Sequence, residues 1–322
     1  MVLAEDLAVE RPVPSHMTAL RAGYAVASGD LVGASAYAPL RLREAPRLVE
    51  AGDPLPPGTD AVLPRDAVTA GPPVEVVLEA APGENVRRVG EDLGAGHVLR
   101  RAGEVLRPLD AAVAAAAGLA DVPVRSFSLD LQGDRRALSI LALFTARGRS
   151  GIRANVVPIG FDAEADGRTI RSGSGADLIV LAAPPPLSSR TPATFGPVLA
   201  EGIALRGAET TLVAAGPTPL IVAPPRLDAL VTLWCCVVDP FSAFLTQRGS
   251  PSVWRRARLT RKIASQVGLT EIALVRETKG GLEPVGSGSI TLAALTQAEG
   301  FLVVPPECEG FSEGAEVEAY EL

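Results

Sequence analysis

The stretch Gly83-Glu84-Asn85-Val86-Arg87-Arg88-Val89-Gly90-Glu91-Asp92, here called the signature loop, decides how the rest of this chain is interpreted. Its glycines permit positive φ angles and close backbone approach. Arg87 and Arg88 carry forked donors suited to phosphate. The adjacent carboxylates of Glu91 and Asp92 suit Mg²⁺, which commonly binds one or two carboxylates together with phosphate oxygens. The alternative is a polar turn whose charged side chains face water.

Composition limits the classes of protein to consider. With 322 residues, the chain has room for two or three domains. A net charge of −7 argues against a general affinity for nucleic acid. No apolar run predicts a membrane span and no signal peptide is expected, so the cytoplasm is the expected location. The three cysteines form neither a disulfide framework nor a zinc spacing. We expect the adjacent Cys235 and Cys236 to pack as small hydrophobic side chains.

Hydrophobic patterning predicts three kinds of region along the chain. Residues 20–105 are typical of short strands separated by Pro and Gly, and residues 108–117 of a helix that begins at a proline. Between residues 125 and 250, apolar runs at 176–182 and 220–223 predict buried strands, with a helix over 194–206. A buried helix is expected over 230–244. Strands at 271–276 and 300–304 predict a final small β domain.

The signature loop resembles the G-x-N-[IV]-R-x-x-G-E-D motif of the molybdopterin molybdenumtransferase family, which includes MoeA and the E domain of gephyrin. Gly23-Tyr24-Ala25-Val26 resembles the end of that family's MDGYAV segment, and residues 51–62 resemble its TGAPxPxGADAV segment. Gly286-Ser287-Gly288-Ser289 resembles its last GSG loop. The resemblance is strong over residues 3–125, faint in the middle and moderate after residue 255.

The resemblance implies a multidomain α/β fold with the family's elongated, homodimeric architecture. Domain I would comprise residues 1–19 and 104–124, with a β-rich domain II over 20–103 inserted in it. Residues 125–250 would form a central three-layer α/β domain of the molybdopterin-binding kind, and residues 251–322 a small β domain.

The resemblance also implies a chemistry and a set of site residues. Family members insert molybdenum from molybdate into adenylylated molybdopterin and release AMP, assisted by Mg²⁺. The implied metal ligands are Glu91 and Asp92. The implied cofactor-binding residues are Asn85, Arg87, Arg88, Gly286, Ser287, Gly288 and Ser289. The alternatives from the residues themselves stay open: the loop of residues 83–92 can be purely structural, and the one of residues 286–289 a plain hairpin turn.

Several family motifs are altered in this chain. The Asp of MDGYA falls on Ala22, and the Thr of TGAP falls on Ala51. The TGDEL motif aligns loosely with residues 132–136, where Arg replaces the Glu. Prolines occupy the glycine-rich GGxSxGxxD loop at 183–189, and the Lys of PGKP is missing near residues 216–219. No catalytic residue is therefore assigned, and whether the chain is an enzyme stays open.

Three functions follow as hypotheses. The first is a divergent member that binds a molybdopterin species with weak or no molybdenum-insertion activity. The second is an active molybdenumtransferase with a rearranged site. The third is a ligand-free dimeric scaffold that pairs with an active paralogue or serves a molybdoenzyme.

Overall fold

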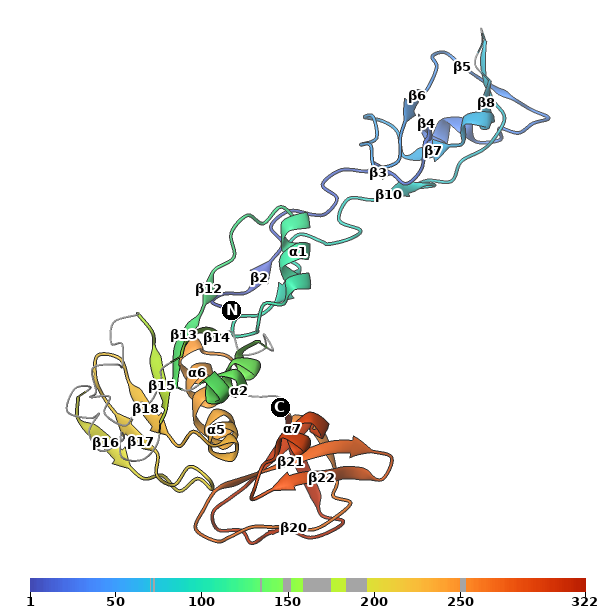
Figure 1. Cartoon of the computed structure of the whole chain (residues 1–322). Helices are drawn as coiled ribbons and strands as arrows, with labels where there is room; N and C mark the ends of the chain where they lie inside the picture. The colour runs from blue at the N-terminus through green and yellow to red at the C-terminus, as the bar shows by residue number, and fades with distance from the viewer. Residues whose placement is uncertain are drawn as a thin grey trace. The chain divides into compact units, whose positions relative to one another are not determined.

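The computed structural model describes residues 1–69, 71, 73–133, 135–146, 152–158, 175–183, 196–249 and 253–322. These residues form two compact units (Figure 1). The smaller unit comprises Asp6–Arg101 and Arg107–Val122. The larger unit comprises Met1–Glu5, Ala102–Leu106 and Pro123–Leu322. The chain passes between the units several times, so neither is continuous in sequence. The four-domain division stays a prediction.

The smaller unit is built from short antiparallel strands. One three-stranded sheet has the order β6-β4-β7 and another the order β5-β9-β8, while β10 pairs with β3 and β11 with β2. The strands are β2 (Leu7–Ala8), β3 (Thr18–Ala19), β4 (Gly23–Val26), β5 (Leu40–Leu42), β6 (Arg47–Val49), β7 (Ala61–Leu63), β8 (Val68–Thr69), β9 (Val74–Val76), β10 (Val86–Arg87) and β11 (Val98–Arg100), with short 3₁₀ turns at Ser28–Leu31 and Arg65–Ala67. This β-rich character is the one predicted for residues 20–105.

Strand alternation divides the apolar residues of the smaller unit between two clusters. Val26 and Leu63 belong to one buried cluster, whereas Ala25 and Val62 belong to another. Successive side chains of a strand point to opposite faces of the sheet. The central sheet of this unit therefore has apolar side chains on both faces.

Helix α1 (Pro108–Ala116) confirms the helix predicted over residues 108–117. Proline suits the first turn because its missing N–H would have no partner inside the helix. Asp110 accepts the backbone N–H of Arg107 at 3.0 Å, which caps the N-terminal end.

A six-stranded sheet forms the centre of the larger unit, in the order β14-β13-β15-β18-β17-β16. Its strands are β13 (Phe127–Gly133), β14 (Ile152–Pro158), β15 (Leu178–Ala182), β16 (Val198–Glu201), β17 (Leu212–Ala214) and β18 (Leu220–Ala223). The first four in the order are parallel, and β17 and β16 are antiparallel to their neighbours. The strands predicted at 176–182 and 220–223 are thus confirmed. A separate short pair joins β1 (Val2–Leu3) to β12 (Val124–Arg125).

Both faces of the central sheet are buried at its middle strands β15 and β18. Val180 of β15 faces the largest apolar cluster of the molecule, whereas its neighbour Leu181 belongs to a second cluster on the opposite face. Helices contribute further residues to the first cluster: α2 (Arg135–Ala146), α5 (Leu227–Leu233), the π-helical turn η3 (Trp234–Val238) and α6 (Asp239–Thr246). A sheet buried on both faces is the middle layer of an α/β fold, as predicted for this region.

The helical run Leu227–Thr246 is long and apolar enough, at 20 residues and a mean hydropathy of 1.7, to cross a membrane. More than half of its most apolar window is buried inside the protein, and Leu230 and Leu233 have no exposed surface. Core helices of globular domains have the same composition. The buried helix predicted over residues 230–244 is confirmed, with bounds a few residues wider.

The helix predicted over residues 194–206 is wrong. Val198–Glu201 instead forms β16, an edge strand paired with β17. Gly196 and Gly202 flank it with positive φ angles of 98° and 84°. The interval between these two glycines leaves room for little more than one helical turn. The alanine and leucine content favoured a helix locally, but the sheet edge supplies hydrogen bonds that a short helix could not.

The C-terminal part of the larger unit is a five-stranded sheet in the order β19-β25-β23-β21-β22. Its elements are β19 (Val253–Arg258), β21 (Glu271–Thr278), β22 (Gly281–Ser287), α7 (Leu292–Gln297), β23 (Gly300–Val304) and β25 (Glu316–Glu321), beside the pair β20 (Ile263–Ala264) and β24 (Gly310–Phe311). β21 and β23 confirm the predicted strands at 271–276 and 300–304. Ile272 and Leu274 pack into the same cluster as the central helices, so the two sheets share a core.

Candidate functional site

The signature loop is a tight turn held by left-handed residues. Gly83, Asn85 and Gly90 have φ angles of 83°, 57° and 72°. Asparagine is among the few residues other than glycine that tolerate this conformation. A Cβ added at Gly83 would lie 2.9 Å from Nη2 of Arg88, so the Arg88 side chain packs directly over that glycine. The glycines thus have the conformational role predicted for them.

Backbone hydrogen bonds join the three N-terminal motifs around β3. The N–H of Ala19 donates to the carbonyl of Asp53 at 2.9 Å, and the N–H of Gly52 donates to the carbonyl of Ala19 at 2.8 Å. The N–H of Leu20 donates to the carbonyl of Asn85 at 2.9 Å. Residues 17–26, 50–62 and 83–87, which are distant in sequence, therefore meet in one place in the smaller unit.

The predicted binding residues of the signature loop have different surroundings. Asn85 is half-buried, and its Nδ2 donates to the carbonyl of Val62 at 2.9 Å. Arg87 is exposed, and its Nη1 lies 3.2 Å from Oδ1 of Asp92. The Arg88 guanidinium is exposed and forms no ion pair or hydrogen bond with the part of the chain that the structure describes. Arg88 is therefore the cation of this loop that is available to an anionic ligand.

The two predicted metal ligands lie side by side but are engaged within the loop. Oε2 of Glu91 accepts the backbone N–H of Arg88 at 2.7 Å, and Asp92 is paired with Arg87. Among the described residues, no three His, Cys, Asp or Glu side chains are close enough together to hold a metal ion. These two carboxylates do not by themselves fit a Mg²⁺ site in a single chain, because an adjacent guanidinium competes for one of them.

Asp60 is a site candidate that the sequence analysis did not single out. Its Oδ1 accepts the backbone N–H of Ser28 at 2.7 Å, and its Oδ2 accepts the Ser28 hydroxyl at 2.7 Å. The backbone and side-chain hydrogen bonds from Ser28 lower the pKa of Asp60 below its ordinary value. A cavity of about 480 Å³ opens beside the pair, with Glu79 and Glu84 in its wall. The signal was the position of Asp60 within the quoted segment 51–62.

The stretch Gly286–Ser289 begins in the last two residues of β22 and continues past its end, and Ser287 contacts a buried carboxylate in the larger unit. Glu271, whose side chain is 2% exposed, accepts the Ser287 hydroxyl at 2.8 Å and the Ser265 hydroxyl at 3.0 Å. Nη1 of Arg206 lies 3.6 Å from the same carboxylate. A Cβ at Gly288 would lie 3.3 Å from Nε of Arg206, so the loop passes over this guanidinium.

Arg206 and Glu271 were missed by the sequence analysis. Arg206 lies on a connection between β16 and β17, and nothing near it in sequence indicates a partner. Its position depends on the N–H of Arg206, which donates to the carbonyl of Thr270 at 2.9 Å. This hydrogen bond joins residues that are distant in sequence, so only the folded structure reveals it. Gly286–Ser289 and the signature loop belong to different compact units.

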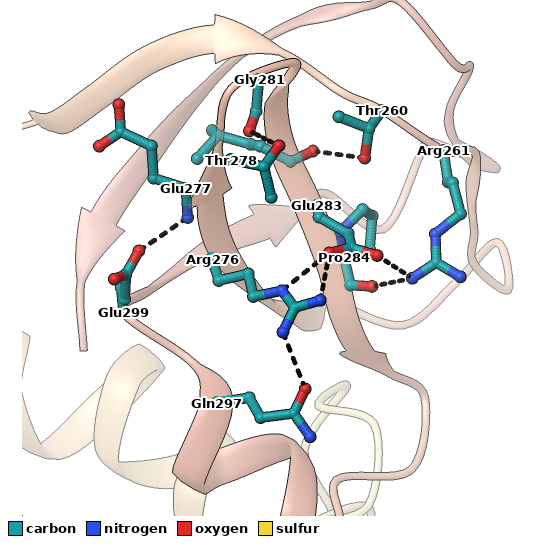
Figure 2. Close-up of polar contacts among 11 residues, drawn as sticks. Thr260, Arg261, Arg276, Glu277, Thr278, Gly281, Glu283, Pro284, Gln297 and Glu299 are labelled. Carbon is teal, nitrogen blue, oxygen red and sulfur yellow. Dashed lines mark hydrogen bonds and ion pairs between the residues drawn. The ribbon is translucent and has the colours of Figure 1, made fainter.

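A polar network fixes the hairpin that leads to this loop (Figure 2). The Glu283 carboxylate accepts Nε of Arg276 at 2.7 Å and Nη2 of Arg261 at 3.1 Å. Nη1 of Arg276 also donates to Oε1 of Gln297 at 3.2 Å. The network joins β21, β22 and α7, and the last two of these elements adjoin Gly286–Ser289 in the chain.

The adjacent cysteines have the packing role that was expected. Cys235 and Cys236 lie on η3 and pack against the main apolar cluster. Burial raises the pKa of the Cys235 thiol well above its ordinary value and that of Cys236 to about 11. Protonated thiols are poor nucleophiles and poor metal ligands. Asp134 and residues 184–189, which belong to two of the altered motifs, lie outside the described residues.

Two family models match the chain. The model of the MoeA N-terminal region, domains I and II, matches residues 1–118, and that of the MoeA C-terminal region, domain IV, matches residues 256–322. Together they span more than half of the chain. The chain belongs to the MoeA family. The resemblance noted from the sequence is thereby confirmed.

Relatives of this MoeA-family chain include molybdopterin molybdenumtransferase 2 of Mycobacterium tuberculosis, 30% identical over 142 residues. That match covers 38% of this chain and only 35% of the relative, about a third of its length. A putative molybdopterin biosynthesis protein of Methanocaldococcus jannaschii is 23% identical over 365 residues, covering 100% of this chain and 89% of the relative.

Solved structures extend the likeness over the whole MoeA fold. A MoeA protein of Pyrococcus horikoshii superposes with a TM-score of 0.72 at 22% identity, covering 99% of this chain and 91% of the other. A molybdenum cofactor biosynthesis protein of Pyrococcus furiosus has a TM-score of 0.53 at 25% identity, covering 73% and 82%. The predicted multidomain α/β fold class of the MoeA type is confirmed.

Proposed function

We propose that this chain acts in molybdenum cofactor biosynthesis by binding a molybdopterin species, with weak or no molybdenum-insertion activity. One observation carries the proposal: the signature loop leaves a cation available while its carboxylates are engaged. The guanidinium of Arg88 has no partner in the described part of the chain. Asp92 is paired with Arg87, and Glu91 accepts a backbone N–H.

The proposed binding of an anionic ligand rests on two arginine side chains. Arg88 is exposed and presents a forked set of N–H groups, which suits the phosphate groups of an adenylylated pterin. Arg206, which is 35% exposed, is the second candidate, because Gly288 allows the loop of residues 286–289 to lie close to it. Asn85 is expected to act indirectly by holding the turn, since its side-chain amide is bound to Val62.

Weak molybdenum-insertion activity is expected because this chain lacks two polar side chains of the family pattern. Ala22 and Ala51 stand where the family pattern has Asp and Thr, and a methyl group can neither bind a metal nor transfer a proton. Losing one catalytic acid or base commonly lowers a rate by about 10²–10⁴. Mg²⁺ stays a prediction that needs further ligands, because Glu91 and Asp92 supply at most two carboxylates.

The binding half of the proposal is tested by equilibrium dialysis of the full chain against adenylylated molybdopterin, with pterin fluorescence as the measurement. Retention that falls with added pyrophosphate supports binding through the phosphates. No retention would refute it and would favour the scaffold hypothesis. An active transferase is the other alternative: it requires AMP release that depends on molybdate and Mg²⁺ and falls sharply in Asp92→Asn.

We also propose that the chain forms a homodimer and is located in the cytoplasm. Phe244 and Leu245 of α6 expose 78% and 44% of their surface, and adjacent exposed apolar side chains favour a protein contact. Light scattering of the Phe244→Ser variant and of the parent chain tests whether these side chains form the dimer interface. Dissociation in the variant alone supports this interface, whereas a parent chain that is monomeric at all concentrations contradicts the dimer.

A further inference from the structure

A second cavity lies in the larger unit, and its lining includes no residue of Gly286–Ser289. Its volume is about 500 Å³, within the range of small-molecule sites. Cys235 of η3 contributes to one wall, and β23 and β25 contribute to another. π-helical turns are rare and often occur at functional sites. Here the turn places an uncharged thiol against the cavity.

Strand alternation makes the opposite wall aromatic. On β25, Val317 and Ala319 are buried in the core of the C-terminal sheet, so Tyr320 points to the other face. Phe301 of β23 lies beside it, with ring centroids 5.8 Å apart and planes inclined by 39°. Phe311 adds a third ring to the lining. Aromatic faces attract cations as well as apolar groups.

The charges that line the cavity are negative. Glu316 and Glu318 belong to the same face of β25 as Tyr320. Arg256 pairs with Glu318 at 2.5 Å, which offsets that charge. Glu316 is exposed and has no ion pair within the described residues, although Arg258 is its register partner on β19. One carboxylate is therefore left to face a ligand.

We propose that this cavity binds a small organic cation, an aromatic or alkyl ammonium ion. The apolar part of the ligand lies against Phe301, Phe311 and Cys235. The ammonium group lies over the ring of Tyr320 and toward the carboxylate of Glu316. This site is independent of the pterin-binding proposal, because none of its residues belongs to the loops invoked there.

The test uses the full chain with benzyltrimethylammonium as the probe, and benzyl alcohol and phenylacetate as the neutral and anionic comparisons. Binding is measured by isothermal titration calorimetry, which serves the parent chain and every variant. The cation is expected to bind best, with an affinity that falls as salt is added. Glu316→Gln should weaken it about fivefold, whereas Glu313→Gln, an exposed carboxylate outside the lining, should not.

Tyr320→Leu provides a second variant. It keeps an apolar wall, so benzyl alcohol should bind as before while the preference for the cation is lost. Circular dichroism establishes that each variant is folded. Equal binding of the three probes, no binding of any, or loss of the cavity in a dimer of this chain would each overturn the proposal.

Discussion

Ser287 donates its hydroxyl to the buried carboxylate of Glu271 at 2.8 Å. The sequence pattern suggested a glycine-serine loop that is either an anion cradle or a plain turn. The contact gives the serine a structural role that neither alternative contained. It also joins the loop to Arg206, which approaches the same carboxylate from another part of the larger unit.

Removing that hydroxyl should destabilise the protein. Ser287→Ala leaves the Glu271 carboxylate, only 2% exposed, with one donor fewer. A buried charged group that loses a hydrogen bond commonly costs about 1–3 kcal/mol. Urea denaturation measures the free energy of unfolding. Ser289→Ala is the matched control, because Ser289 is exposed and its hydroxyl has no partner among the described residues. Equal stabilities of the two variants would contradict the structural role.

Arg88→Ala should weaken retention of adenylylated molybdopterin without destabilising the fold. A charged hydrogen bond to phosphate contributes about 1.5–3 kcal/mol, so an affinity loss of roughly tenfold or more is expected. Arg87→Ala is the comparison, since Arg87 is already paired with Asp92 and should matter less. Equilibrium dialysis with pterin fluorescence gives both affinities. A larger loss of affinity in Arg87→Ala than in Arg88→Ala would mean that Arg87, and not Arg88, is the cation that binds the ligand.

Asp60 should make stability depend on pH in the acidic range. Hydrogen bonds from Ser28 lower the pKa of Asp60 in the folded state. The stabilisation is therefore present above the unfolded value, 3.8, and is lost as the pH falls through the lower folded pKa. Thermal unfolding across this range should show Asp60→Asn less stable than the parent at neutral pH, with the difference narrowing in acid. A difference that stays constant with pH would exclude Asp60 as the source.

Gly23 is required by the approach of two strands. A Cβ at this position would lie 2.0 Å from the carbonyl oxygen of Leu63 on β7. Gly23→Ala should therefore destabilise the smaller unit by more than about 2 kcal/mol. Gly29→Ala is the control, because a Cβ there meets nothing within 4 Å. Hydrogen exchange of β4 and β7 localises the effect. Normal protection of both strands in Gly23→Ala would show that the backbone adjusts.

Local sequence predicted the elements whose determinants are local. The proline at the start of α1 and the continuous apolar runs of β15 and β18 specify their elements with little help from the fold. The helix predicted over β16 is wrong because the strand character of β16 depends on hydrogen bonds to β17, which lies elsewhere in the sequence. The same limit applies to the site. The residue types locate the signature loop. They do not show that the Asn85 amide is bound to Val62, or that the Arg88 guanidinium has no ion pair or hydrogen bond among the described residues.

The most direct test of the proposed function is AMP release per bound pterin in a single turnover. The full chain is mixed with adenylylated molybdopterin, molybdate and Mg²⁺, and bound pterin and free AMP are measured in the same sample. Molybdopterin molybdenumtransferase 2 of Mycobacterium tuberculosis serves as the reference. We predict bound pterin with AMP released at least about 10²-fold more slowly than in the reference. Bound pterin with AMP release at the reference rate would contradict the proposal, since other groups would then supply the chemistry that Ala22 and Ala51 cannot.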